Sequence, residues 1–475
     1  MGQITVLGLG PGALQDLTLQ AWRILEQADE VWLRTRHHPV VAGFPQDLRV
    51  HAFDEVYEQA ESFEDVYATI VERVLTLGAR EEGVIYAVPG HPLVGESTVT
   101  QLIEAADAAS VGIRVVGGLS FVEPTLTALA LDALDGLQVF DALDLASLNH
   151  PPLNPDFPAL IGQVYNRQTA SELKLVLMNQ YADDHPTALV DAAGTDRQRV
   201  EFLPLYQIDR QPVTPLTSLY VAPLAHESSF ESFQQTVAKL RSPEGCPWDR
   251  KQTHKSLRTN LLEESYEVLS GIDADDPQAL SEELGDLLLQ IVLHAQIAVE
   301  TGEFRMTDVI AGINTKLKRR HPHVWGETEV SGVGEVITNW EAIKRQEREG
   351  RGEVDRSLLD GVPDALPALA QADAYLDRAG RLGFDLSMVM PESWEMLSDC
   401  LPEERDALDR ETLGRILFAL VKLAQAFDHD PESALREASL RFAERFRVLE
   451  RETRRRQVPL DALSIEEIRR LWRET

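Results

Sequence analysis

The chain has 475 residues, 44% of them hydrophobic, which allows about two to four folded domains with cores of their own. Its formal net charge of −33 argues against binding to nucleic acid or an anionic membrane, because neutralising phosphates requires clustered lysine and arginine. Two cysteines cannot form a disulfide framework, and we find neither a run of about 18 apolar residues nor a basic leader. We therefore expect a soluble, cytoplasmic protein.

Residues 1–224 have the pattern of an α/β domain. Short β-rich runs alternate with helical patterns, and we expect strands at residues 4–7, 31–33, 84–88, 113–116, 173–177 and 218–221. Several of these runs are apolar throughout, as the buried strands of a mostly parallel sheet are. The β-rich runs stop near residues 225–228, where we place the end of this domain.

A glycine-rich turn at residues 8–12 follows the first expected strand. With Ala13 it satisfies the GxGxxA fingerprint of dinucleotide-binding domains. However, Pro11 lies inside the turn, and no ribose-binding acidic residue follows the next expected strand. A nicotinamide-dinucleotide domain is therefore the weaker of two interpretations.

The turn is the first of several ordered motifs, which are Gly8-Leu-Gly-Pro-Gly12, Val88-Pro-Gly-His-Pro-Leu93, Gly117-Gly-Leu-Ser120, Val176-Leu-Met178 and Thr217-Ser-Leu-Tyr220. Together they resemble the tetrapyrrole (corrin/porphyrin) methylases over about residues 1–224. The resemblance implies a cleft between two α/β lobes that binds S-adenosylmethionine through Gly10, Pro11, Gly12, Pro89, Gly90, His91, Ser120 and Met178. The family usually has aspartate where this chain has His91, so the methyl acceptor stays open. His91 is either a catalytic base or, as is more common in such loops, a structural hydrogen-bonding residue.

The helical half begins near residue 229 and contains two carboxylate doublets, Glu264 with Glu267 and Glu283 with Asp286. Residues three apart on a helix share a face, and residues 271–277 break the helical pattern between the doublets. Two antiparallel helices would point four carboxylates at one place, where their repulsion favours a divalent cation with oxygen ligands, Mg²⁺ or Mn²⁺. The alternatives are a solvated acidic surface and an EF-hand, which the proline of this turn does not fit.

Apolar residues around the doublets predict that both helices are packed. They are Leu262, Tyr266, Leu269, Leu284, Leu287, Leu288 and Ile291. Gly285 inside the second helix costs about 1 kcal/mol relative to alanine, which indicates a close helix approach or a ligand.

A basic cluster at residues 316–326 follows the carboxylates and is the densest in this acidic chain. Such clusters are commonly solvated helix faces, but these cations could also neutralise a polyphosphate held by the metal. Trp248 precedes the first carboxylate helix. Stacking on a base and core packing both fit the sequence, and we expect packing.

Residues 246–257, 263–267, 283–286 and 318–326 resemble the MazG family of all-α nucleoside triphosphate pyrophosphohydrolases, over about residues 229–350. The resemblance implies Mg²⁺-dependent cleavage of a nucleoside triphosphate to monophosphate and pyrophosphate, with Glu264, Glu267, Glu283 and Asp286 as metal ligands. We expect Glu263 to accept a proton from the attacking water. The candidates for triphosphate contacts are Lys316, Arg319, Arg320 and Lys344, and we expect only one of the two adjacent arginines to face it.

Residues 357–475 repeat this helical pattern in degenerate form. Glu392 and Glu395 echo the first doublet, and residues 411–417 echo residues 282–288. In this copy Thr412 and Arg415 replace the second doublet, so half of the metal ligands are lost. We expect a structural or dimerising role for it.

The sequence thus predicts a multi-domain protein in which a methylase-like α/β domain (1–224) precedes a MazG-type all-α domain (229–350) and a degenerate helical copy (357–475). The leading hypothesis is a Mg²⁺-dependent nucleoside triphosphate pyrophosphohydrolase that forms a homodimer. The alternatives are a methyltransferase whose helical half serves dimerisation and a metabolite-sensing regulatory protein. The metal doublets do not encode the preference for base or sugar.

Overall fold

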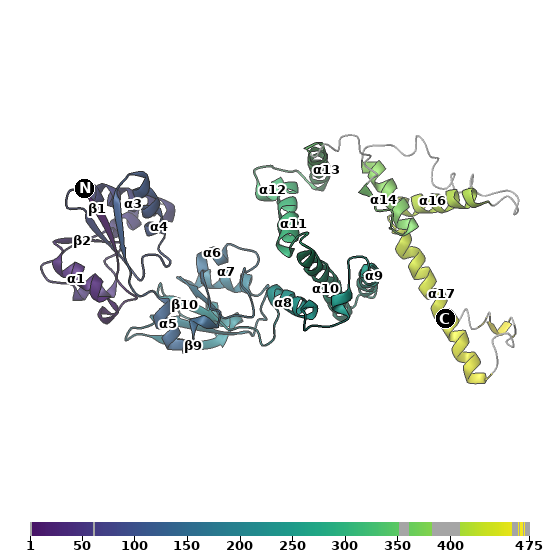
Figure 1. Ribbon diagram of the computed structural model, residues 1–475, viewed down its shortest axis with the longest axis horizontal. Coiled ribbons are helices and arrows are strands. Elements are labelled where there is room, and N and C mark those ends of the chain that lie inside the picture. The colour runs from purple at the N-terminus through teal and green to yellow at the C-terminus, as the bar shows by residue number, and fades with distance from the viewer. Residues whose placement is uncertain are drawn as a thin grey trace. The chain divides into compact units, whose positions relative to one another are not determined.

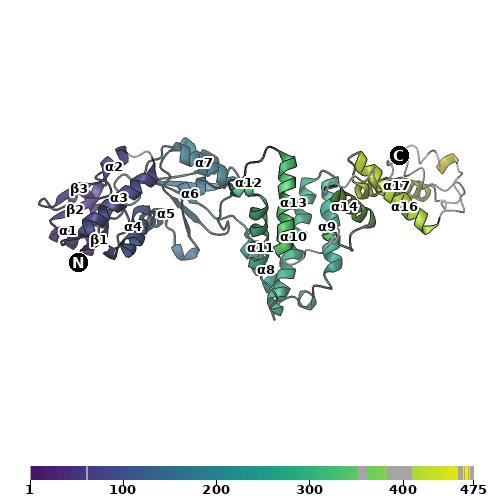
Figure 2. The same ribbon diagram turned by 90° about the horizontal axis from the view of Figure 1, so that it is seen from above.

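Figures 1 and 2 show the computed structural model of the chain in two views. It describes residues 2–59, 62–350, 361–381, 409–457, 464, 466–468 and 470. These residues fall into two compact units, Met1–Val309 and Ile310–Thr475.

The first lobe of the first unit is a parallel sheet with helices on both faces (Figure 1). Its strands lie in the order β3 (Arg49–Ala52), β2 (Glu30–Leu33), β4 (Val84–Val88), β1 (Gln3–Gly8) and β5 (Gly112–Val116). Helix α1 (Leu19–Gln27) packs on one face, and α3 (Phe63–Gly78) and α4 (Ser97–Ala108) pack on the other. The short α2 (Asp54–Gln59) precedes α3. The four strands expected in this lobe are confirmed.

The second lobe is a mixed sheet in the order β6 (Gln138–Asp141), β7 (Ala159–Gly162), β10 (Thr217–Val221), β8 (Pro186–Asp191) and β9 (Arg199–Pro204). The β6–β7 pair is parallel, and the other three pairs are antiparallel. The prediction of a mostly parallel sheet is therefore wrong for this lobe. Short connections such as that between β8 and β9 leave no room for the crossover that parallel pairing needs.

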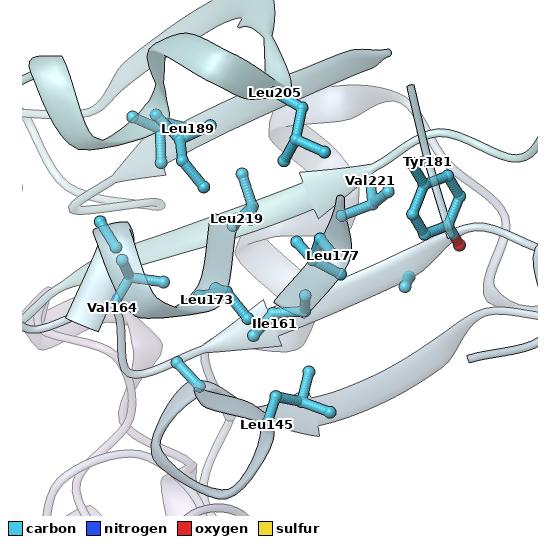
Figure 3. Close-up of a cluster of buried hydrophobic side chains, with 14 of the residues drawn as sticks. Leu145, Ile161, Val164, Leu173, Leu177, Tyr181, Leu189, Leu205, Leu219 and Val221 are labelled. Atoms are coloured by element: carbon cyan, nitrogen blue, oxygen red, sulfur yellow. The ribbon is translucent and has the colours of Figure 1, made fainter. Parts of the chain in front are cut away.

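After α5 (Val122–Leu129) come α6 (Ala142–Ala146) and α7 (Arg167–Leu177). The core of the second lobe lies between this sheet and the last two of these helices. Figure 3 shows Leu173 and Leu177 of α7 among Ile161, Leu189 and Leu219 of the strands. All of these side chains are buried. They hold the sheet against its helix layer.

The predicted strand at residues 173–177 is wrong, because this segment is the end of α7. Asn166 begins the helix by accepting a hydrogen bond from the Thr169 N–H at 2.9 Å. Lys174 leaves the buried face and binds Asp209 at 2.6 Å. A short apolar run fits a strand or a helix equally well, and the cap and the burial pattern decide for the helix.

The helices that follow in the first unit are α8 (Phe230–Arg241), α9 (Arg258–Asp273) and α10 (Pro277–Thr301). Asp156 of the second lobe anchors the start of α8 by accepting hydrogen bonds from the Ser228 N–H at 2.6 Å and the Ser229 hydroxyl at 2.5 Å, and also from the Ser232 hydroxyl. Burial alone would raise the pKa of Asp156, but these hydrogen bonds lower it to about 2. The lobe and the first helix are thus joined by a charged cap.

The break predicted at residues 271–277 is confirmed in place but is shorter, because only residues 274–276 lie outside the two helices. Helix α9 ends at Asp273, and Asp275 adopts a positive φ of 50°. Asp276 then caps α10 by accepting from the Gln278 N–H at 3.0 Å, with Pro277 in the first turn. Helix α10 has the length and mean hydropathy (1.2) of a membrane span, but core helices share these properties, and 33% of that stretch is buried.

The second unit is helical in its described residues. After α11 (Met306–Arg320), which begins in the first unit, it contains α12 (Pro322–Trp325), α13 (Val333–Gly350), α14 (Ala368–Arg381), α16 (Arg410–Ala426) and α17 (Pro431–Arg456). Gln425 of α16 donates to the Asp373 carboxylate of α14 at 2.8 Å. Thr412 and Arg415 lie on α16, whereas the echo at Glu392 and Glu395 lies outside the described residues. The predicted fold class, α/β followed by all-α, is confirmed.

Candidate functional site

Three of the four predicted metal ligands converge where α9 and α10 pass each other. Glu264, Glu267 and Glu283 each offer an oxygen, and these oxygens lie within 4.8 Å of one another. Asp286 is not in this group, but its charge acts on two of its members. Burial, Glu267 and Asp286 together raise the pKa of Glu264, and partial burial with the same two neighbours raises the pKa of Glu283. An all-oxygen set of mutually repelling carboxylates fits a hard divalent cation such as Mg²⁺.

Close contact near the turn brings the two helices together. A Cβ atom on Gly271 of α9 would lie 3.1 Å from the backbone of Leu280 in α10, so glycine permits this approach. Gly285 was the expected contact point, but no described atom from outside α10 lies within 4 Å of its Cβ position. The expectation of a close helix approach at Gly285 is therefore wrong.

The apolar residues around the carboxylates are largely exposed rather than packed. Within the chain Leu262 is 55% exposed, Leu284 48% and Ile291 44%. Burial in the described helices lies further along α10, around Val292 and Leu293. The prediction that both helices are packed on these side chains is wrong for a single chain.

Trp248 lies on the turn between α8 and α9, just before the short 3₁₀ segment Asp249–Lys251. Its side chain is 58% exposed, so the expectation of core packing is wrong. The exposed indole leaves stacking on a ligand as the interpretation that the sequence also allowed.

Carboxylates bind three of the four predicted phosphate-binding cations of the second unit. Arg319 and Arg320 both bind Glu347 of α13, each at 2.6 Å. Hydrogen bonds from Arg320 and then Arg319 lower the pKa of Glu347 to about 2. The expectation that the two arginines face different ways is wrong, because their long side chains at the end of α11 bend to one acceptor. Lys344 binds Glu341 at 3.0 Å, and Lys316 is half-buried on α11.

Aromatic side chains pack beside Arg320. The guanidinium of Arg320 lies over the Trp340 ring at 5.5 Å, and His321 packs edge-on against the same ring at 4.8 Å. Trp340 and Glu347 are seven residues apart on α13 and therefore share a face. That spacing is the signal by which the sequence could have paired them.

In the first lobe, the turns that follow β1, β4 and β5 meet at the carboxyl edge of the sheet. The Gly10 and Gly90 backbones exchange two hydrogen bonds, of 3.2 and 2.8 Å. A Cβ atom on Gly8 would lie 2.6 Å from the Gly118 nitrogen, so this junction requires glycine. Ligands of parallel α/β sheets bind at this edge, where the expected cofactor contacts at Gly10 and Gly90 lie.

The other predicted cofactor residues divide between this edge and its surroundings. The His91 ring lies beside Gly117, and its Nδ1 accepts from the Leu93 N–H at 3.1 Å, which is the structural role that the sequence left open. The buried Ser120 donates to Glu123 at 2.6 Å. Pro11 and Gly12 continue the first turn, where Gly12 approaches Thr195 of the second lobe. Pro89 precedes Gly90, and Met178 follows the last residue of α7 in the second lobe.

Comparison with known proteins identifies both halves. The model of the tetrapyrrole (corrin/porphyrin) methylases matches residues 3–209, and that of the MazG nucleotide pyrophosphohydrolase domain matches residues 252–325. The uncharacterized protein YabN of Bacillus subtilis is 39% identical over 489 aligned positions, which cover 100% of this chain and 98% of YabN. The nucleoside triphosphate pyrophosphohydrolase/pyrophosphatase MazG of Thermotoga maritima is 42% identical over 248 residues, 51% of this chain and 94% of that protein. The chain belongs to the MazG family.

The MazG domain of this chain is joined to an N-terminal tetrapyrrole methylase domain, as the motifs predicted. Among solved structures, the uroporphyrin-III C-methyltransferase of Thermus thermophilus is similar, with a TM-score of 0.37 and 21% identity over 46% of this chain and 92% of that one. The roles of single residues stay predictions.

The methylase domain also contains polar residues that sequence reasoning passed over. His38 is buried, and its Nε2–H donates to the Gly10 carbonyl at 3.0 Å. Burial lowers the pKa of His38 to about 4. Arg34 donates to Glu96 at 2.5 Å and to the Tyr57 hydroxyl at 2.8 Å. Its position directly after β2 is the signal that could have identified it, because the carboxyl ends of parallel strands carry ligand-binding residues.

Proposed function

We propose that the MazG domain hydrolyses nucleoside triphosphates between the α and β phosphates, giving a nucleoside monophosphate and pyrophosphate. The observation that carries the proposal is the convergence of Glu264, Glu267 and Glu283 from two helices, with Asp286 acting on them. The similarity to MazG of Thermotoga maritima over 94% of that protein supports the same activity. The net charge of −33 argues against nucleic acid as the ligand.

Glu264, Glu267, Glu283 and Asp286 would hold one or more Mg²⁺ or Mn²⁺ ions. When bound, the cation supplies positive charge that offsets the charge of the phosphates. Glu263 is exposed beside Glu264 on α9 and would accept the proton of the water that attacks phosphorus. Pyrophosphate then leaves, and the proton passes to solvent.

Arg319, Arg320, Lys316 and Lys344 are the proposed triphosphate contacts. Because both arginines bind Glu347, a triphosphate that reaches them either displaces this carboxylate or binds the remaining N–H groups of the arginines. Trp248 is proposed to stack on the nucleobase, since it is a large, exposed aromatic on a turn.

We propose that the methylase domain binds S-adenosylmethionine at the turns joined by Gly10 and Gly90. The paired glycine backbones at the carboxyl edge of a parallel sheet support this proposal. Methyl transfer to an acceptor is the second candidate function. Thermal shift with S-adenosylmethionine, with and without Mg²⁺-nucleotide, tests whether the domain binds the cofactor.

We propose that the protein is a cytoplasmic homodimer. Exposed leucines and isoleucines on α9 and α10, including Leu262, Leu284 and Ile291, support an assembly that covers them. Light scattering of the purified chain decides between a dimer and a monomer.

The test of the hydrolase is a panel of ribo- and deoxyribonucleoside triphosphates incubated with Mg²⁺, with products resolved chromatographically. We expect monophosphate and pyrophosphate, loss of turnover by at least a hundredfold in Glu267→Gln or Asp286→Asn, and loss on removal of metal by a chelator. Glu282→Gln is the matched control, because this exposed neighbour on α10 is outside the carboxylate group. Near-normal activity of Glu267→Gln with bound metal would show that the metal centre is assigned wrongly.

A further inference from the structure

The turn that carries Trp248 is fastened by one side chain, that of Arg241 at the end of α8. Its guanidinium donates to both carboxylate oxygens of Glu300 in α10, at 2.9 and 2.7 Å. It also donates to the carbonyl oxygens of Asp249 at 2.5 Å and Gln252 at 3.3 Å. The Arg241 side chain is only 5% exposed, whereas that of its partner Glu300 is 37% exposed.

The rest of the turn has little freedom either. A Cβ atom on Gly245 would lie 2.2 Å from the Leu240 carbonyl oxygen, and the Cys246 N–H donates to that oxygen at 2.7 Å. Arg250 closes the turn from the other side through the Pro243 carbonyl at 2.9 Å. Trp248 is therefore an exposed aromatic on a fixed backbone. Ordering an exposed tryptophan in advance lowers the entropy lost when a flat ring binds to it.

The contacts of Arg241 require a planar fork. Two parallel N–H groups meet the Glu300 carboxylate, while the remaining nitrogen reaches the two carbonyl groups of the turn. A lysine at this position keeps the positive charge but carries a single ammonium group, which cannot reach α10 and the turn together. Arg241→Lys therefore separates the charge from the positioning.

We propose that Arg241 is a positioning residue that holds Trp248 in place to stack on the nucleobase of the substrate. This inference rests on the proposed pyrophosphohydrolase activity. It assigns base recognition to the turn between α8 and α9 and leaves recognition of the triphosphate to other groups. Loosening the turn then weakens binding of the base and leaves binding of phosphates unchanged.

The experiment compares KM and kcat for a nucleoside triphosphate with the inhibition constant of inorganic tripolyphosphate, which has no base. For Arg241→Lys we expect KM to rise about tenfold, within the range of one lost base–aromatic stack, with kcat unchanged and an unchanged inhibition constant for tripolyphosphate. Glu300→Gln should raise KM in the same direction by a smaller factor. Arg258→Lys is the matched control, because it makes the same exchange at an exposed position at the start of α9, and its KM should stay at the wild-type value.

The double variant with Trp248→Ala provides the decisive comparison. If Arg241 acts through Trp248, then Arg241→Lys has no further effect once the indole is gone, and Trp248→Phe retains most of the affinity. Additive effects, or an equal loss of affinity for tripolyphosphate, would overturn the inference and show a general structural role. Absence of turnover by the wild-type protein would instead refute the proposed function itself.

Discussion

Replacing Gly285 with alanine should stabilise α10, because the new methyl group would not clash with neighbouring residues. Gly285 lies in the interior of a long helix, and no described atom from outside this helix is within 4 Å of its Cβ position. Alanine is favoured over glycine inside a helix by about 1 kcal/mol, which lowers the equilibrium constant for opening of the helix about fivefold. Hydrogen exchange that depends on this opening should slow by the same factor. Amide hydrogen exchange of α10 measures this locally, without requiring the whole chain to unfold in one step.

Activity should not change in the same variant. At about 100° per residue, Gly285 points about 160° away from Glu283 and about 100° away from Asp286, so the methyl group avoids the carboxylate face. Gly271→Ala is the matched control, because there the methyl group meets the Leu280 backbone at 3.1 Å and should cancel or reverse the gain. Faster exchange in Gly285→Ala would refute the reasoning, since it would mean that another chain or unit packs against this position.

Two further predictions concern the α/β half. Asp156→Asn should speed hydrogen exchange at the start of α8 by removing charge-assisted bonds, worth roughly 2 kcal/mol. In the wild type this contribution to stability is present above about pH 4 and is lost as the pH falls towards 2, because the folded pKa of about 2 lies below the ordinary value. Unchanged hydrogen exchange in Asp156→Asn would refute the role of the cap. His38 has a folded pKa of about 4, against an ordinary value of about 6.5. The unfolded chain therefore binds a proton that the folded chain does not, and the free energy of unfolding of the first lobe should fall by up to roughly 3 kcal/mol as the pH drops from 6.5 to 4. Exchange of β1 amides should show a weaker pH dependence in His38→Gln but not in His37→Gln, whose ring is exposed; equal slopes in the two variants would contradict the assignment.

Local chemistry made the carboxylate site predictable. The spacing of Glu264 with Glu267 and of Glu283 with Asp286 fixes which side chains share a helix face, and a turn with Asp276 and Pro277 reverses the chain. Glycine turns after strands were equally readable, since such turns need positive φ angles or close backbone contact, as at Gly10 and Gly90. These features depend on neighbours a few residues apart along the chain.

The errors arose where the outcome depends on contacts between distant segments. The apolar run at residues 173–177 suits a strand or a helix, and the sheet on which it packs decides between them. A tryptophan or leucine side chain does not specify whether anything covers it, so Trp248 and Leu284 were expected to be packed and are exposed. The hydrophobicity of a side chain favours its burial but does not determine which surface covers it.

The sequence by itself determined the two-part organisation, the family of each half and the face on which the carboxylates lie. The tertiary structure decided which of these side chains meet, that Arg319 and Arg320 share Glu347, and that Arg241 fastens the turn of Trp248. The physical reason is the range of the interactions. Helix periodicity and turn geometry act within a few residues, whereas the ion pair between Arg241 and Glu300 joins residues 59 positions apart.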